Sequence, residues 1–226
     1  MSDAAALSSS FPAGLDHTAD QRDKHIYFVD LSDNGSKMKL CYHLLILALR
    51  FITIIPHLLV FAFHSNKKMI LSDTATVKNL ILSLVFARQY RNLFYHRIGN
   101  IKYFFKWILP EDRTLDIPGS MKIGKTALFI HNTSSFLNAE SIGDYFVCYH
   151  HVTLGTNRLG GQQKPVIGNN VMVCTGAVVV GGITVGDNVI IGANAVVVKD
   201  VPPNCTVIGS PARIVKQNGV RVDILL

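Results

Sequence analysis

Histidine side chains that could transfer protons gather near the middle of the 226-residue sequence, at His131, His150 and His151. A histidine imidazole has an ordinary pKa of about 6.5 and can take a proton from a hydroxyl group at neutral pH. The four cysteines have neither the spacing of a metal site nor that of a disulfide framework, so a reducing compartment is expected. They are Cys41, Cys148, Cys174 and Cys205.

A period of six residues organises the chain after these histidines. Aliphatic residues recur at every sixth position from 167 to 197, and a second set follows each of the first five by four places. Neither a helix nor an alternating strand has this period. It is typical of a parallel β-helix, in which three six-residue units close one triangular coil. The alternative is a β-rich core with a coincidental period. The two sets are Ile167, Val173, Val179, Val185, Ile191 and Val197, then Val171, Ala177, Ile183, Val189 and Ala195.

The same frame extends backwards with two interruptions. The step from Phe129 to Phe136 is seven residues instead of six, which predicts a bulge in the coil. Residues 155–166 (GTNRLGGQQKPV) are too many and too polar for one unit, so they are predicted to form a loop, where functional residues often lie. The inward-facing positions predicted here are Ile123, Phe129, Phe136, Ile142, Cys148 and Leu154.

Counting along this frame brings the histidines together. Phe129 and Cys148 are three units apart and should stack on neighbouring coils. His131 and His150 each follow this pair by two residues, so they should lie on one face of the β-helix, with His151 next to them.

The N-terminal half has a different character. Residues 1–36 are polar and acidic and are expected to form a disordered or weakly ordered tail, with a short strand at residues 25–31 and no signal-peptide core. Residues 37–113 hold twelve Lys/Arg and three Asp/Glu, which gives this segment a net charge of +9. The whole chain has a net charge of +7, because the rest of it is slightly acidic. This charge suggests an anionic partner, either a phosphorylated cofactor or a membrane surface; without base-reading motifs, nucleic acid is not expected.

Residues 40–63 are strongly apolar and long enough to span a bilayer. Arg50, Pro56 and His57 lie inside the stretch and oppose a span. Three interpretations stay open: a buried helical hairpin, an interfacial helix pair and a transmembrane helix. We favour a helix pair that contacts a membrane surface or packs in an oligomer, in a cytoplasmic protein that is peripheral at the inner face of the membrane.

Residues 73–107 have the apolar spacing of one or two helices, with Ser72 or Asp73 as the N-cap. The basic residues of this region are expected to form a solvated face. They are Arg88, Arg91, Arg97, Lys102 and Lys106. We therefore predict four regions: the tail (1–36), a helical segment (37–114), the β-helix domain (115–216) and a C-terminal tail (217–226), which could instead form a short strand.

Three stretches resemble the hexapeptide-repeat acyltransferases, in the serine acetyltransferase-like branch that includes O-acetyltransferases of capsule and exopolysaccharide synthesis. They are RNLFYHRIG (91–99), HHVTLGT (150–156) and GANAVVVKDVPPNCTVIGSPARIVK (192–216), and the likeness covers about residues 80–216. The resemblance implies a left-handed β-helix, a homotrimer, acetyl-CoA between two subunits and a histidine general base, with no metal.

The resemblance also assigns site residues. His131 lies where the catalytic histidine is expected, but Ile130 replaces a preceding Asp, and Lys164 replaces a second histidine that His150 or His151 could supply. Arg213 or Lys216 could pair with the CoA phosphates. The alternative for the small residues is a purely structural role at the corners. The implied CoA-binding residues are Gly155, Gly176, Ala177, Gly192, Ala193, Ala212, Arg213 and Lys216.

The function expected from this resemblance is acetyl-CoA-dependent O-acetylation of a hydroxyl, with a surface-polysaccharide sugar or its precursor as the favoured acceptor. One alternative is a serine O-acetyltransferase of cysteine biosynthesis. A second alternative is a non-catalytic β-helix scaffold that has lost its base.

Overall fold

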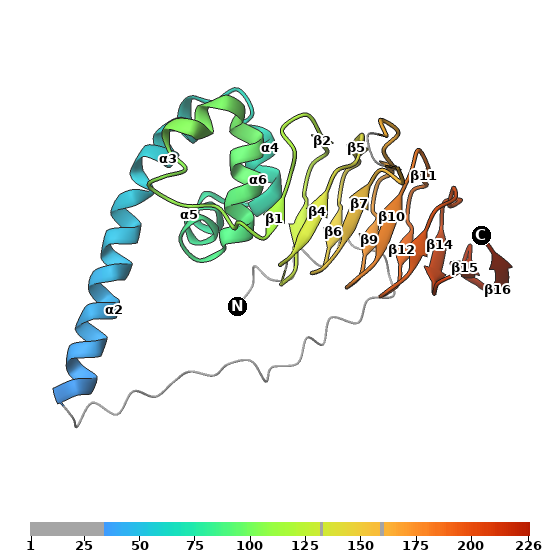
Figure 1. The fold of residues 1–226 in the computed structure, drawn as a ribbon. Helices are drawn as coiled ribbons and strands as arrows, with labels where there is room; N and C mark the ends of the chain where they lie inside the picture. The colour runs from blue at the N-terminus through green and yellow to red at the C-terminus, as the bar shows by residue number, and fades with distance from the viewer. Residues whose placement is uncertain (1–33, 132, 159–160) are drawn as a thin grey trace. The chain divides into compact units, whose positions relative to one another are not determined.

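A computed structural model describes residues 34–131, 133–158 and 161–226 (Figure 1). The tail expected over residues 1–36 lies almost wholly outside the described residues, as does the strand expected at 25–31. The chain divides into two compact units, one ending at Ile52 and the other comprising Thr53–Leu226. Each unit is considered by itself.

The first unit contributes one long helix, α2 (Asn34–Thr53), whose described side chains from Tyr42 onward are mostly exposed. The next helix, α3 (Ile55–Phe63), has Pro56 in its first turn, where the missing N–H leaves no hydrogen bond unmade. The helical stretch Tyr42–Phe63 is 22 residues long and apolar enough to cross a membrane by length and composition.

Short helices follow α3 in the second unit and pack around one apolar core. Thr76 is the N-cap of α5, because its Oγ1 accepts a hydrogen bond from the Asn79 N–H at 3.1 Å. The prediction that Ser72 or Asp73 would be the N-cap is wrong, since both lie inside α4. The C-cap of α4 is Ala75, with φ +64°. The elements are α4 (Lys67–Thr74), α5 (Val77–Phe86), α6 (Arg88–Ile98) and the 3₁₀ helix η2 (Gly99–Phe104).

Two arginines of α6 are buried, contrary to the predicted solvated face. The Arg91 guanidinium donates to the carbonyl oxygens of Leu84 and Val85, each at 2.7 Å, and of Pro110 at 2.9 Å. Leu84 and Val85 lie in the last turn of α5, where carbonyls lack helical partners and a cation is favoured. A guanidinium has five donors, so it can be buried where an ammonium could not satisfy as many carbonyls.

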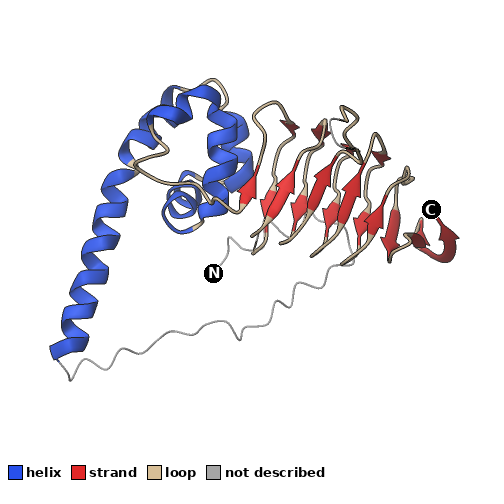
Figure 2. Cartoon of the chain, viewed as in Figure 1, coloured by secondary structure: helices blue, strands red, loops and turns tan. Residues whose placement is uncertain are grey.

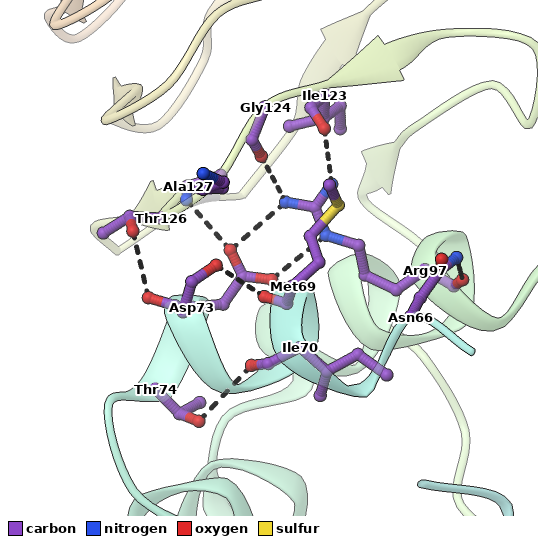
Figure 3. Close-up of polar contacts among 12 residues, drawn as sticks. Asn66, Met69, Ile70, Asp73, Thr74, Arg97, Ile123, Gly124, Thr126 and Ala127 are labelled. Atoms are coloured by element: carbon purple, nitrogen blue, oxygen red, sulfur yellow. Dashed lines mark hydrogen bonds and ion pairs between the residues drawn. The ribbon is translucent and has the colours of Figure 1, made fainter. Parts of the chain in front are cut away.

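The second buried arginine joins the helices to the β-helix (Figure 3). Arg97 forms an ion pair with Asp73, Nε to Oδ2 at 3.1 Å, and donates to the carbonyl oxygens of Ile123 and Gly124 at 2.6 Å each. The Ala127 N–H donates to the same carboxylate at 3.1 Å. Burial raises the pKa of Asp73, and the hydrogen bond from Arg97 acts in the opposite direction.

Three parallel sheets form the faces of the β-helix (Figure 2), and successive strands of the chain enter them in turn. Sheet A contains β1 (Leu115–Asp116), β4 (Ser135–Leu137), β7 (Thr153–Gly155), β10 (Val178–Val180) and β13 (Val196–Val197). Sheet B contains β2 (Lys122–Ile123), β5 (Ser141–Ile142), β8 (Val166–Ile167) and β11 (Thr184–Val185). Sheet C contains β3 (Leu128–Phe129), β6 (Val147–Cys148), β9 (Met172–Val173), β12 (Ile190–Ile191), β14 (Cys205–Ile208), β15 (Arg213–Gln217) and β16 (Val220–Leu225).

The predicted frame is correct except at the first interruption. Leu137, not Phe136, is the buried residue of β4, and it lies in register with Leu154 of the next coil. Phe136 is 43% exposed. The spacing between inward residues is therefore eight from 129 to 137, followed by five from 137 to 142. The extra length falls in the turn that carries His131, and side-chain alternation along β4 then decides which residue points inward.

Asparagines stabilise the corner between sheets B and C. Asn170, Asn188 and Asn204 have φ values of +54°, +58° and +58°, a region that Asn tolerates better than most residues. The Asn170 amide donates to the side-chain oxygen of Asn188 at 2.8 Å, and the Asn188 amide donates to that of Asn204 at 2.9 Å. This ladder connects successive coils at their surface.

Residues 217–226, expected as a short strand or a tail, are largely part of an antiparallel hairpin. β16 pairs with β15, which itself pairs antiparallel with β14. Asn218 and Gly219 between the strands have φ values of +50° and +83°, as a two-residue hairpin turn of this sequence requires. The hairpin thereby extends sheet C beyond its last parallel strand.

We predict that Arg97→Leu lowers the free energy of unfolding by about 3–5 kcal/mol, because Asp73 would be left buried without its partner. Urea denaturation followed by circular dichroism measures the loss. Arg88→Leu is the matched control, since Arg88 is exposed at the start of the same helix, and it should change stability by less than about 0.5 kcal/mol. An equal loss in both variants would contradict a specific role for the Arg97 ion pair.

Candidate active site at one corner of the β-helix

The predicted catalytic histidines lie in turns that lead from sheet C to sheet A. Phe129 and Cys148 are paired in register, as are Cys148 and Val173. His131 and His150 each follow this row by two residues, in successive turns. The backbone hydrogen bonds give the place of His150 in the first turn to Thr133, so His131 lies in the inserted part of that turn. We call the turns after β3, β6, β9, β12 and β14 the histidine corner.

Backbone hydrogen bonds hold these turns against one another. The His151 N–H donates to the Thr133 carbonyl at 2.9 Å, and the Gly176 N–H donates to the His150 carbonyl at 3.1 Å. His151 and Gly176 have φ values of +58° and +70°, so this left-handed position recurs along the corner. His131 has φ +46° in the lengthened first turn, a conformation that costs a residue other than glycine about 1–2 kcal/mol. Such strain is concentrated at functional sites.

The three imidazoles have different surroundings. His131 and His151 are exposed, whereas His150 is half-buried. The His150 and His151 rings meet edge to face, with centroids 5.2 Å apart. Within the described part of the chain, the buried Nδ1 of His150 has no hydrogen-bond partner. One imidazole nitrogen is therefore held inside the corner, beside the His151 ring, which is open to solvent.

Several of the predicted CoA-binding residues belong to the same corner. Gly176 and Ala177 lie in the turn after β9, and Gly192 and Ala193 lie in the turn after β12. The Ala177 side chain is fully buried inside the coil, so only its backbone faces the corner. Ala193 is exposed. The histidines and these small residues thus follow one another along a single edge of the β-helix.

The glycines of the corner are also required by the fold. A Cβ at Gly176 would collide with the side chain of Asn194, and its φ is that of a left-handed residue. A Cβ at Gly192 would approach Cγ2 of Ile208 to 2.8 Å. A structural role at the corners therefore accounts for both glycines. Because a glycine has no side chain, a ligand could also lie close to the backbone of these turns.

The remaining predicted CoA-binding residues are more scattered. Gly155 ends β7 at a different corner, where the loop to β8 begins. Ala212 is buried directly after the last turn of the histidine corner. Arg213 forms an exposed ion pair with Asp223 of β16, so a phosphate would compete with that carboxylate.

A further cation on the terminal hairpin was not singled out from the sequence. Arg221 of β16 is the register partner of Lys216 on β15, and both are exposed. Like charges opposite one another disfavour a strand pair and favour an anion beside it. The sequence does not reveal the pairing of Lys216 with Arg221, because the hairpin has no repeat from which the register could be counted.

Residues 34–131, 133–158 and 161–226 contain no group of three or more His, Cys, Asp or Glu side chains that could hold a metal ion. Lys164, which stands where the resemblance expects a second histidine, is half-buried in the loop before β8.

Known proteins share this architecture. Residues 164–199 match the family described as bacterial transferase hexapeptide (six repeats). The chain is 44% identical over 110 residues to a serine acetyltransferase of Synechococcus elongatus, covering 48% of this chain and 45% of the relative. It is 46% identical over 128 residues to one of Staphylococcus aureus (strain Mu50), covering 55% and 56%. The serine acetyltransferase of Brucella abortus strain S19, in complex with coenzyme A, superposes with a TM-score of 0.59 at 25% identity over 71% of each chain.

These matches and the stacked parallel strands show the predicted fold, a left-handed parallel β-helix with hexapeptide repeats that is preceded by helices. Within that class, the predicted resemblance to the serine acetyltransferase-like acyltransferases is confirmed. The chain spans about half the length of the curated relatives it matches.

We predict that His150→Leu leaves the free energy of unfolding unchanged or raises it by up to about 1 kcal/mol, because it removes a buried nitrogen that lacks a partner. The measurement is urea denaturation at pH 8. His57→Leu is the control: both His57 nitrogens are hydrogen-bonded, to Thr53 and Tyr95, so the same substitution should lose about 1–3 kcal/mol. A similar loss at His150 would show that its Nδ1 is satisfied.

Proposed function

We propose that this chain is an acetyl-CoA-dependent O-acetyltransferase and that L-serine is its acceptor. The observation that carries the proposal is the placement of His131 and His150 in successive turns, each two residues after the paired strands β3 and β6, on an edge that continues into small residues. The names of the relatives support acetyl transfer to serine, and the coenzyme A complex of a structural neighbour supports the donor.

The chemistry needs one base and a site for the thioester. In the proposed reaction His131 takes the proton of the acceptor hydroxyl as its oxygen attacks the thioester carbonyl. A backbone N–H of the histidine corner stabilises the resulting oxyanion. Collapse breaks the carbon–sulfur bond, and the proton held by His131 passes to the departing thiolate. The acetyl group is then an ester of the acceptor, and free CoA leaves.

The acceptor is the point at which this proposal departs from the sequence analysis. A surface-polysaccharide sugar was favoured there, but the relatives that match are serine acetyltransferases, which favours the alternative. The sugar remains the second candidate because Ile130 and Lys164 differ from the serine enzymes' pattern. The exposed apolar helices also suit a membrane-adjacent acceptor.

We also propose that the active form is a homotrimer with acetyl-CoA bound between copies. Outward-facing apolar residues on the strands and turns of the β-helix support this arrangement, since they would be covered by neighbouring copies. They include Leu128, Phe136, Tyr145, Val166 and Val198.

Thiol release from acetyl-CoA tests the function, with L-serine and a panel of sugars and nucleotide sugars as acceptors. We expect release with L-serine, and we expect His131→Ala to lower the rate by about 10²–10⁴-fold, the usual contribution of a general base. His64→Ala is the control, because it makes the same substitution after the end of α3, outside the β-helix, where the imidazole accepts a hydrogen bond from the Asn66 N–H at 3.1 Å.

Each other outcome points to a different conclusion. Release with a sugar but not with L-serine would show that the acceptor is a sugar, and the proposal of an acetyltransferase would stand. Undiminished activity in His131→Ala would reject His131 as the base. Binding of acetyl-CoA without release to any acceptor, including lipid-linked sugars, would favour the non-catalytic scaffold.

A further inference from the structure

Helix α3 has two faces with different environments. Ile55, Leu59 and Phe63 recur at every fourth position and form one exposed stripe, with Phe63 88% exposed. Ile54 and His57 are buried between α3 and the rest of the second unit. A soluble surface rarely leaves a continuous stripe of large apolar residues uncovered unless something binds there.

The buried face attaches α3 firmly to the protein. His57 Nε2 lies 2.8 Å from the Tyr95 hydroxyl, and its Nδ1 lies 3.0 Å from the Thr53 carbonyl oxygen. Its ring also packs against Phe94 and Phe105, with centroids 6.2 Å and 5.7 Å away. A helix held in this way has protein on one side, so it can lie on a membrane surface but cannot be surrounded by lipid.

A second group of exposed apolar side chains lies beside α3. Phe104 and Trp107 are 74% and 76% exposed, and they flank Phe105, which contacts His57. The Nζ atoms of Lys102 and Lys106 lie 5.6 Å and 5.1 Å from the centroid of the exposed Tyr103 ring. Aromatic rings interspersed with lysines are typical of the boundary between lipid headgroups and acyl chains.

The charge of this region specifies the kind of surface. Residues 35–72 contain no Asp or Glu. Lys67 and Lys68, in the first turn of α4 just beyond Phe63, are both exposed. Lys106 forms a long ion pair with Glu111, at 3.9 Å. Lysines near an anionic bilayer strengthen binding, because the negative surface potential of the bilayer attracts them.

We propose that α3 and residues 101–107 dock this chain on an anionic lipid bilayer. Leu59, Phe63, Phe104 and Trp107 enter the headgroup region, and the neighbouring lysines pair with lipid phosphates. Binding is at the surface, with α3 parallel to the bilayer. The inference does not depend on the acetyltransferase activity.

Trp107 is the one tryptophan of the sequence, so its fluorescence reports on this site alone. The full-length protein would be titrated with phosphatidylcholine vesicles containing 30% phosphatidylglycerol, and with pure phosphatidylcholine vesicles. We expect a blue shift of the emission with the anionic vesicles, quenching by lipids brominated near the headgroup, and reversal by high salt. No shift with anionic vesicles would overturn the proposal.

Variants separate this docking from other sources of membrane affinity. The double substitution Leu59→Ser with Phe63→Ser should lower the affinity for the anionic vesicles at least tenfold. Val220→Ser with Leu225→Ser removes two exposed apolar side chains from β16 of the terminal hairpin, and it should change the affinity for the anionic vesicles less than twofold. Equal effects of the two pairs would overturn the assignment of the surface.

Two further results would also reject surface docking. A blue shift that depends on protein concentration without vesicles would identify a second copy of the chain as the occupant. Retention of the protein on vesicles after an alkaline carbonate wash would indicate a span through the bilayer.

Discussion

The buried ion pair between Asp73 and Arg97 is the interaction on which the second unit depends. A parallel β-helix begins with a coil that has no preceding strand, so carbonyl groups of that coil lack partners from the repeat. Arg97 donates to two of these carbonyls, at Ile123 and Gly124. Asp73 neutralises the guanidinium and accepts a hydrogen bond from the Ala127 N–H. One charged pair therefore connects α4, α6 and the first coil.

Other polar side chains extend this cap. The Asn92 amide of α6 donates to the carbonyl oxygens of Asp112 and Leu115 at 2.8 Å and 2.7 Å. The Thr126 hydroxyl donates to the Ser72 carbonyl at 3.0 Å. A repeat protein needs atypical units at its ends, because each coil can bury its apolar surface only against a neighbour. The helices serve this purpose at one end, and the β15–β16 hairpin extends the last sheet at the other.

The cap matters for the histidine corner because that corner starts in the first complete coil. His131 follows β3, whose only strand partner is β6. Its turn is lengthened and has a left-handed residue, so its conformation depends on a rigid first coil. His150 and His151 lie one coil further on, where backbone hydrogen bonds to both neighbouring turns hold them.

Much of this arrangement follows from the sequence alone. A six-residue period is typical of a β-helix, so the coil, its corners and the pairing of Phe129 with Cys148 could be counted from the sequence, and with them the presence of His131 and His150 in successive turns. The inward residue of β4, the buried Arg91 and Arg97 and the terminal hairpin could not. Each depends on partners distant in sequence: Leu154 for Leu137, the carbonyls of α5 and the first coil for the arginines, and β15 for β16. The repeat encodes contacts between equivalent positions, and only the tertiary structure decides what happens where the repeat is interrupted or ends.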